Sequence, residues 1–210
     1  MALSSLPVEL LIAIFSLACT DHGRTGCALN VTSKAFRDIC LNSSVDLQCV
    51  AVLGGDKFQR FTDTLNLREH RRVTSLLLSD ESEYYPVISD IWRLIFTILH
   101  AISPRDLRIL HVSLDIPEHH KLRTPLENSS FAWLPISFPS LVDLQLPCHV
   151  YHPSFPSTHT AVSPALQSLR IKAIPQGLGA MLEREFPNLT DLTIDIPVAP
   201  YTSTIPVNLF

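Results

Sequence analysis

The segment LRILHV, residues 107–112, carries the pattern that decides the fold, because apolar residues stand at its first, fourth and sixth positions. Apolar residues that alternate with polar ones are typical of a strand with one buried face. The same spacing recurs in VTSLLL (73–78), LVDLQL (141–146), LQSLRI (166–171) and LTDLTI (189–194). The starts lie 34, 34, 25 and 23 residues apart, which indicates a repeated strand-plus-connection unit.

The segments between these strands contain helix and turn signals. FPS, SPA and FPN introduce three of the strands, as turn residues do. Residues 86–103 run from Pro86 to just before Pro104 and place apolar residues along one helical stripe, at Ile88, Ile91, Ile95, Ile98 and Ile102. A shorter helix is expected around 176–186, whereas 116–138 and 147–164 are rich in Pro, Ser and His and are expected to be surface loops. Strands alternating with helices predict an α/β fold, a curved solenoid with a parallel sheet.

The repeat also predicts which side chains share a face. If Leu144, Leu169 and Leu192 stack in register, their neighbours form one row on the opposite face, and Lys172 stands beside Asp195. That row consists of Gln145, Arg170 and Thr193. We expect this open face, with Gln145, Arg170, Lys172 and Thr193, to be the surface that binds a target. A solvated polar face without a ligand is the alternative.

The N-terminal stretch LPVELLIAIFSLA (6–18) reads as a retained helix. A secretion signal needs a basic residue before its apolar segment, but the first basic residue is Arg24, and Glu9 interrupts the apolar run. Pro7 and Glu9 suit the first turn of a helix. Two apolar stripes result, the first with Leu6, Leu10, Ile14 and Leu17 and the second with Leu11, Phe15 and Ala18. We expect one to pack within the domain and the other against a partner, the alternative being a fully buried helix.

The next stretch, TGCALNVTSKAFRDIC (25–40), continues the helical pattern, with Thr25 as a candidate cap. Together the two stretches make a helical unit of about 40 residues, which is near the lower limit for independent stability. We therefore expect the unit to dock on the rest of the chain or on a partner.

These residues resemble the F-box, especially as found at the start of many mushroom-type fungal F-box proteins. The similarity covers roughly residues 5 to 41 and rests on the LPVELL opening, on Ile14-Phe15 and on the later SKAFRDI segment (33–39). It implies docking onto a Skp-type adaptor, and through it onto a cullin–RING ubiquitin ligase, while a second domain selects the substrate. Carried over from the family, the adaptor contacts are Leu6, Pro7, Leu10, Leu11, Ile14, Phe15, Val31, Lys34 and Phe36.

The later part of the chain resembles the irregular leucine-rich repeats of F-box proteins, although the asparagine that usually follows the strand is absent. The expected organisation is an F-box at 1–45, a helical connector at 46–69 and a leucine-rich-repeat-like domain at 70–210. The apolar ending YTSTIPVNLF (201–210) follows the last repeat directly. We expect either that the chain is a truncated form or that this segment folds back over the last repeat.

The composition bears on which partners, metals and cofactors the chain could bind. The net charge is −4, so no basic field draws the chain to nucleic acid or to a membrane surface. Five cysteines without a CxxC pair favour reduced thiols in the cytoplasm or nucleus. The densest set of metal-binding types, Cys148, His149, His152 and His159, lacks a strict site spacing, so we expect no bound metal. No GxSxG or HExxH motif is present, and we expect neither an enzyme nor a cofactor.

Two other functions fit the same residues. The first is a repeat-domain binding module whose N-terminal helices only cap the solenoid, which would have no adaptor affinity. The second is a secreted, glycosylated protein or hydrolase, which would have a cleaved N-terminus and a modified Asn128 or Asn188. Sequons are also present at Asn30 and Asn42.

Overall fold

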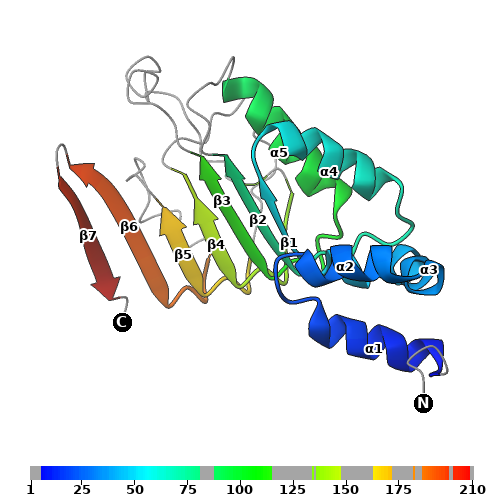
Figure 1. The fold of residues 1–210 in the computed structure, drawn as a ribbon. Helices are drawn as coiled ribbons and strands as arrows, with labels where there is room; N and C mark the ends of the chain where they lie inside the picture. The colour runs from blue at the N-terminus through cyan, green and yellow to red at the C-terminus, as the bar shows by residue number, and fades with distance from the viewer. Residues whose placement is uncertain are drawn as a thin grey trace.

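The chain folds as an N-terminal group of helices followed by a mixed α/β region, in which parallel strands form one sheet (Figure 1). The structure is a computed structural model of the 210-residue chain. It describes residues 6–80, 88–114, 134, 136–147, 163–171, 182, 186–198 and 201–208.

Three helices and a 3₁₀ turn form the N-terminal helical unit, residues 6–47. These elements are α1 (Val8–Ala18), α2 (Arg24–Thr32), α3 (Lys34–Ser43) and η2 (Val45–Leu47). The Pro7 carbonyl accepts the first hydrogen bonds of α1, from Leu10 and Leu11. Ser33 is extended and caps α3 by accepting a hydrogen bond from the Phe36 backbone N–H.

The cap of α2 differs from the expectation. Thr25 lies inside the helix, where its backbone N–H and its hydroxyl both donate to the Asp21 carboxylate. Asp21 therefore has the role that was expected of Thr25, because an ionised carboxylate accepts from two donors at the positive end of the helix. The same hydrogen bonds lower the pKa of Asp21 below its ordinary value.

Within the described residues the strands form one seven-stranded sheet, in which the strands lie side by side in chain order. Neighbours from β1 to β6 pair in parallel. The strands are β1 (Cys49–Leu53), β2 (Ser75–Asp80), β3 (Ile109–Leu114), β4 (Asp143–Leu146), β5 (Ser168–Ile171), β6 (Asp191–Val198) and β7 (Tyr201–Asn208). Each of the five expected strands is present and begins two residues after the start of its sequence pattern.

The strand register confirms the expected stack of leucines. Leu144 lies opposite Leu169, and Leu169 lies opposite Leu192. The same row continues in the other direction through Leu110 and Leu76 to Val50 of β1. All six side chains are buried, so this row forms the spine of the core.

In each repeat unit, one backbone carbonyl accepts two hydrogen bonds from the next unit. The Gln48 carbonyl accepts hydrogen bonds from the N–H groups of both Thr74 and Ser75. The carbonyls of Thr74, Arg108, Val142 and Gln167 each accept two N–H groups of the following unit in turn. Each of these carbonyls comes from the second position of its sequence pattern. The units therefore share a backbone contact as well as an apolar spacing.

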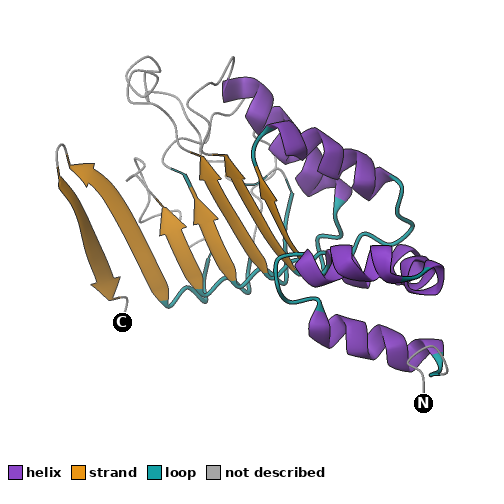
Figure 2. Ribbon diagram, viewed as in Figure 1, coloured by secondary structure: helices purple, strands orange, loops and turns teal. Residues whose placement is uncertain are grey.

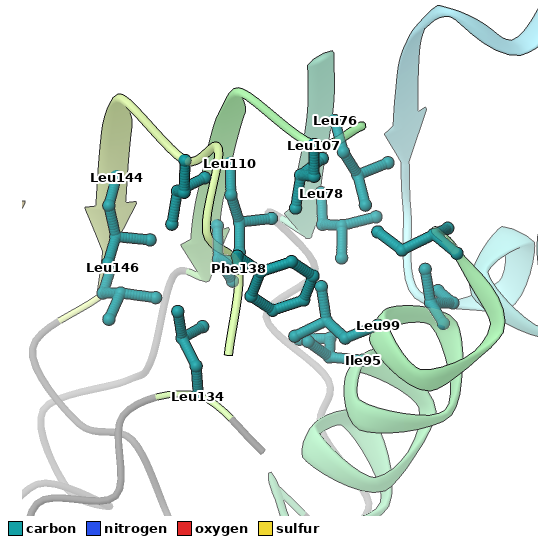
Figure 3. Close-up of a cluster of buried hydrophobic side chains, with 14 of the residues drawn as sticks. Leu76, Leu78, Ile95, Leu99, Leu107, Leu110, Leu134, Phe138, Leu144 and Leu146 are labelled. Carbon is teal, nitrogen blue, oxygen red and sulfur yellow. The ribbon is translucent and has the colours of Figure 1, made fainter. Parts of the chain in front are cut away.

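Helices α4 (Asp56–Asn66) and α5 (Ile88–Ala101) cover one face of the sheet near its β1 end (Figure 2). The expected stripe of α5 is buried at Ile91, Ile95, Ile98 and Ile102. Ile95 and Leu99 project from α5 toward the strand leucines and Phe138 (Figure 3). The opposite face of the sheet carries the polar positions of each strand.

The segment 46–69, expected to be a helical connector, contains strand β1 as well as helix α4. The sequence LQCVAV (47–52) has the same spacing as the five quoted segments, and its Leu47, Val50 and Val52 are buried. This strand was missed, although the pattern that predicted the others also marks it. The repeat therefore begins directly after the helical unit.

Strand β7 pairs with β6 in the antiparallel direction, so residues 201–208 fold back along the last parallel strand. Of the two alternatives expected for the C-terminal segment, this arrangement agrees with the one in which the segment folds back on the last repeat. Most of the helix expected at 176–186, and most of the expected loops 116–138 and 147–164, lie outside the described residues.

Candidate interaction surfaces

Helix α1 has one buried and one exposed apolar face. Leu11 and Phe15 are each only 4% exposed, whereas Leu10 is 52%, Ile14 42% and Leu17 81% exposed. The exposed residues lie three and four positions apart, so they share one side of the helix. We call Leu10, Ile14 and Leu17 the α1 stripe.

The buried face of α1 packs on a small core of its own. Phe15 makes an edge-to-face contact with Phe36 of α3, with ring centroids 5.0 Å apart. The buried members of this core are Leu11, Phe15, Ile39, Cys40 and Val45. Because these residues come from α1, α3 and η2, the core determines which side of α1 faces outward.

The residues carried over as adaptor contacts fall into two groups by exposure. Exposed side chains are Pro7, Leu10, Ile14, Val31 and Lys34. Leu6 and Phe36 are half-buried against the small core, and Leu11 and Phe15 belong to that core. Only the first group is therefore available to a partner without a change in the packing of the helices.

Two exposed apolar residues next to this group were not among the expected contacts. Val8 is about half exposed, and Leu17 is the most exposed residue of the α1 stripe. Leu17 was already on the first stripe by its spacing, so periodicity was the signal that could have found it. Val8 had no such signal, because its exposure depends on the packing of the other helices.

Ser16 holds α1 to the start of the sheet. Its hydroxyl donates to the Gln48 side-chain oxygen at 2.8 Å, in the segment between η2 and β1. A substitution of Ser16 would therefore remove a contact between α1 and the segment that leads into the sheet.

The polar row expected on the open face of the sheet is present. Gln145 lies opposite Arg170, and Arg170 lies opposite Thr193, on adjacent strands. The Arg170 side chain is exposed, and Gln145 and Thr193 are half-buried. Lys172, expected in the same surface, lies outside the described residues. We call Gln145, Arg170 and Thr193 the polar row.

A His–Asp contact extends the polar row toward β3. His111 pairs in register with Gln145, and its Nε2 lies 3.0 Å from Oδ2 of Asp143. Each side chain is about one third exposed. The contact joins residues 32 positions apart, so the order of the strands had to be known before it could be predicted.

Two cysteines are enclosed by the helical unit. Burial raises the pKa of the Cys40 thiol to about 12 and that of Cys19 to about 11, and the nearby Asp46 carboxylate adds to both shifts. Both thiols are therefore protonated at neutral pH. Cys27, in contrast, is exposed.

The described part of the chain contains neither a candidate metal cluster nor a candidate membrane-spanning helix. No group of three or more His, Cys, Asp or Glu side chains there is placed to hold a metal ion. The set Cys148, His149, His152 and His159 lies outside the described residues. None of the described helices has both the length and the apolar character needed to cross a bilayer.

No protein-family model, no curated protein and no solved structure matches this chain.

Proposed function

We propose that this protein is a substrate-recognition subunit of a cullin–RING ubiquitin ligase, working in the cytoplasm or nucleus. The helical unit acts as an F-box and docks on a Skp-type adaptor, which joins it to the cullin. The sheet region acts as a leucine-rich-repeat-like solenoid that holds a target protein. The chain itself carries out no chemistry in this proposal.

The observation that carries the proposal is the apolar outer face of α1. A helix that only caps the end of a repeat array presents a polar face to water. Here Leu10, Ile14 and Leu17 are exposed instead, next to the sequence signature that resembles the F-box. An apolar stripe with i, i+4 and i+7 anchors fits a partner groove.

The expected loss of adaptor affinity can be derived from the number of apolar side chains of the α1 stripe that are removed. Truncating an apolar anchor that a partner buries costs about 1–3 kcal/mol of binding free energy. A loss of about 1.4 kcal/mol weakens binding tenfold. Removing two anchors of the α1 stripe therefore lowers adaptor affinity well beyond the error of a binding measurement.

The adaptor test uses the full chain and a purified Skp-type adaptor. Leu10→Ala with Ile14→Ala is expected to weaken binding at least about tenfold, because both side chains leave the proposed groove. The matched control is Leu67→Ala, which shortens a leucine that is 84% exposed after α4. Thermal unfolding of all variants is measured alongside, and we expect the unfolding temperatures to agree closely because none of the three side chains is buried. Equal adaptor binding by the double variant and the wild type would refute the F-box role.

A second candidate is a repeat-domain binding module whose helices cap the sheet. It is favoured by the hydrogen bond from the Ala51 N–H of β1 to the His22 carbonyl, which covers part of the sheet edge. In that case the wild-type chain has no measurable affinity for the adaptor. The same binding experiment therefore separates the two functions.

The proposed target surface is the polar row on the open sheet face. Its support is the regular spacing of Gln145, Arg170 and Thr193 on neighbouring strands, about 4.8 Å apart. Arg170→Glu is expected to reduce the proteins captured from proteasome-inhibited cells while adaptor binding persists. Arg93→Glu, an exposed site on α5, is the control. Unchanged capture by Arg170→Glu would move the target site to another part of the chain.

A further inference from the structure

A buried ion pair joins the helical unit to the part of the chain that carries the sheet. Arg68 follows α4, and its Nη2 lies 2.7 Å from Oδ2 of Asp46 in η2. The two side chains are only 6% and 3% exposed. Buried charges of this kind persist only when they are paired and hydrogen-bonded.

The Arg68 guanidinium also reaches the end of α3. Its Nη1 donates to the Cys40 carbonyl at 2.9 Å. The Cys40 carbonyl also accepts the backbone N–H of Ser44, so the guanidinium adds a second donor to it. A cation near the C-terminal end of a helix interacts favourably with the helix dipole. Cys40 lies in the small core with Leu11 and Phe15, so this contact is close to the packing of α1.

Asp46 in turn holds α2. Its Oδ2 accepts a hydrogen bond from Nδ2 of Asn30 at 2.8 Å. Gly26 of α2 lies so close to Asp46 that an added Cβ would come within 2.7 Å of the Asp46 carbonyl oxygen. Helices α2 and α3 and the turn η2 therefore meet at the Asp46–Arg68 pair.

A further contact joins the same two parts of the chain. The Ser44 hydroxyl donates to the His70 carbonyl, two residues after Arg68. The segment 68–70 therefore runs along the end of α3 and supplies polar partners to the helical unit.

We propose that Arg68 is a positioning residue for the helical unit: it comes from the sheet-bearing part of the chain, yet it holds α2 and α3 in the arrangement that turns the α1 stripe outward. The inference deepens the proposed function and rests on it for the role of the stripe. It places the boundary of the adaptor-binding unit after residue 70, beyond the F-box-like segment.

The test is hydrogen exchange of the full chain, read separately for each element. Arg68→Met keeps an unbranched side chain but lacks the guanidinium. It therefore removes both contacts and leaves Asp46 buried without its cation. We expect amides of α1, α2 and α3 to exchange at least about tenfold faster, while those of β2 to β4 keep their protection. Arg93→Met is the matched control, because Arg93 is exposed and its partner is the exposed Asp90.

Arg68→Lys is the second variant, for the case in which Arg68→Met does not fold. A lysine retains the charge but lacks the planar fork that reaches Asp46 and the Cys40 carbonyl together. We expect a smaller rise in exchange, confined to the same three helices. Exchange that is unchanged, or that rises equally in the helices and the sheet, would overturn the positioning role.

Adaptor binding is the second readout and keeps the two proposals distinguishable. If the wild-type chain binds the adaptor, Arg68→Met is expected to weaken that binding by about tenfold or more without altering any residue of the α1 stripe. If the wild-type chain does not bind, the proposed function fails, whereas the exchange pattern still decides the positioning role of Arg68.

Discussion

The ring of Phe15 in α1 stands edge-on to the ring of Phe36 in α3, with the centroids 5.0 Å apart and the planes at 73°. This contact determines which of the two apolar faces of α1 is internal. Leu11 lies one turn before Phe15 on the buried side, and Leu10 and Ile14 consequently face outward. The surface proposed for the adaptor is thus a consequence of packing within the helical unit.

Phe15→Ala is expected to lower the free energy of unfolding by about 3–5 kcal/mol, because it leaves a cavity and removes the aromatic pair. Urea denaturation of the full chain measures the change. Leu17→Ala, on the exposed side of the same helix, serves as the control and is expected to change stability by no more than about 0.5 kcal/mol. Similar losses for the two variants would contradict the described orientation of α1.

Leu144→Ala is expected to cost about 2–5 kcal/mol, because Leu144 is fully buried between Leu110 and Leu169 in the core row. The next residue in the chain, Gln145, provides the comparison for the loss of stability. Gln145→Ala removes a half-buried side chain on the opposite face and is expected to cost about 0.5 kcal/mol or less. Chemical denaturation of both variants tests the alternation along β4, and a larger loss for Gln145→Ala would mean that the strand is turned over.

Gly26→Ala is expected to destabilise the protein, although alanine is favoured over glycine inside a helix by about 1 kcal/mol. The added methyl group would meet the backbone of Asp46, which cannot move without disturbing its pair with Arg68. On the same helix, Ala28→Gly at an exposed position is expected to cost about 0.5–1 kcal/mol from propensity alone. Thermal unfolding compares the two, and a higher unfolding temperature for Gly26→Ala would show that α2 is not pressed against η2.

The raised pKa values of Cys19, about 11, and Cys40, about 12, predict a loss of stability at high pH. Between the ordinary thiol pKa of 9.0 and these folded-state values the unfolded chain binds fewer protons than the folded one. The free energy of unfolding therefore decreases as pH rises through that range, whereas the contribution is complete below it.

The measurement is urea denaturation under reducing conditions from about pH 8 to about pH 11. Other groups also titrate in this range, so the wild type is compared with Cys40→Ala, whose stability is expected to decrease less steeply. Cys27→Ala is the control because Cys27 is exposed. A pH dependence that is the same in the wild type and Cys40→Ala would show that the Cys40 thiol does not contribute.

Most of the sheet could be predicted from the sequence because strand alternation is a local property. The leucines of the repeat alternate with polar residues, and this pattern alone predicted the row Leu144, Leu169 and Leu192 together with its polar neighbours. The same pattern also marks the five-residue strand β1 through Leu47, Val50 and Val52.

The contacts that join distant parts of the chain could not be predicted in the same way. Asp46 and Arg68 are 22 positions apart, and His111 and Asp143 are 32 positions apart. Nothing in the local spacing of either pair distinguishes it from surface charges. Each pair forms only because other elements bring its members together.

The sequence by itself determined that α1 has two apolar stripes and that each strand has one apolar face, because these follow from residues three or four apart on a helix and two apart on a strand. The tertiary structure decided which stripe of α1 is covered and that Arg68 contacts both Asp46 and the Cys40 carbonyl of α3. Those outcomes depend on Phe36, Cys40 and Asp46, which reach their places only when separate segments pack together and exclude water from the surfaces between them.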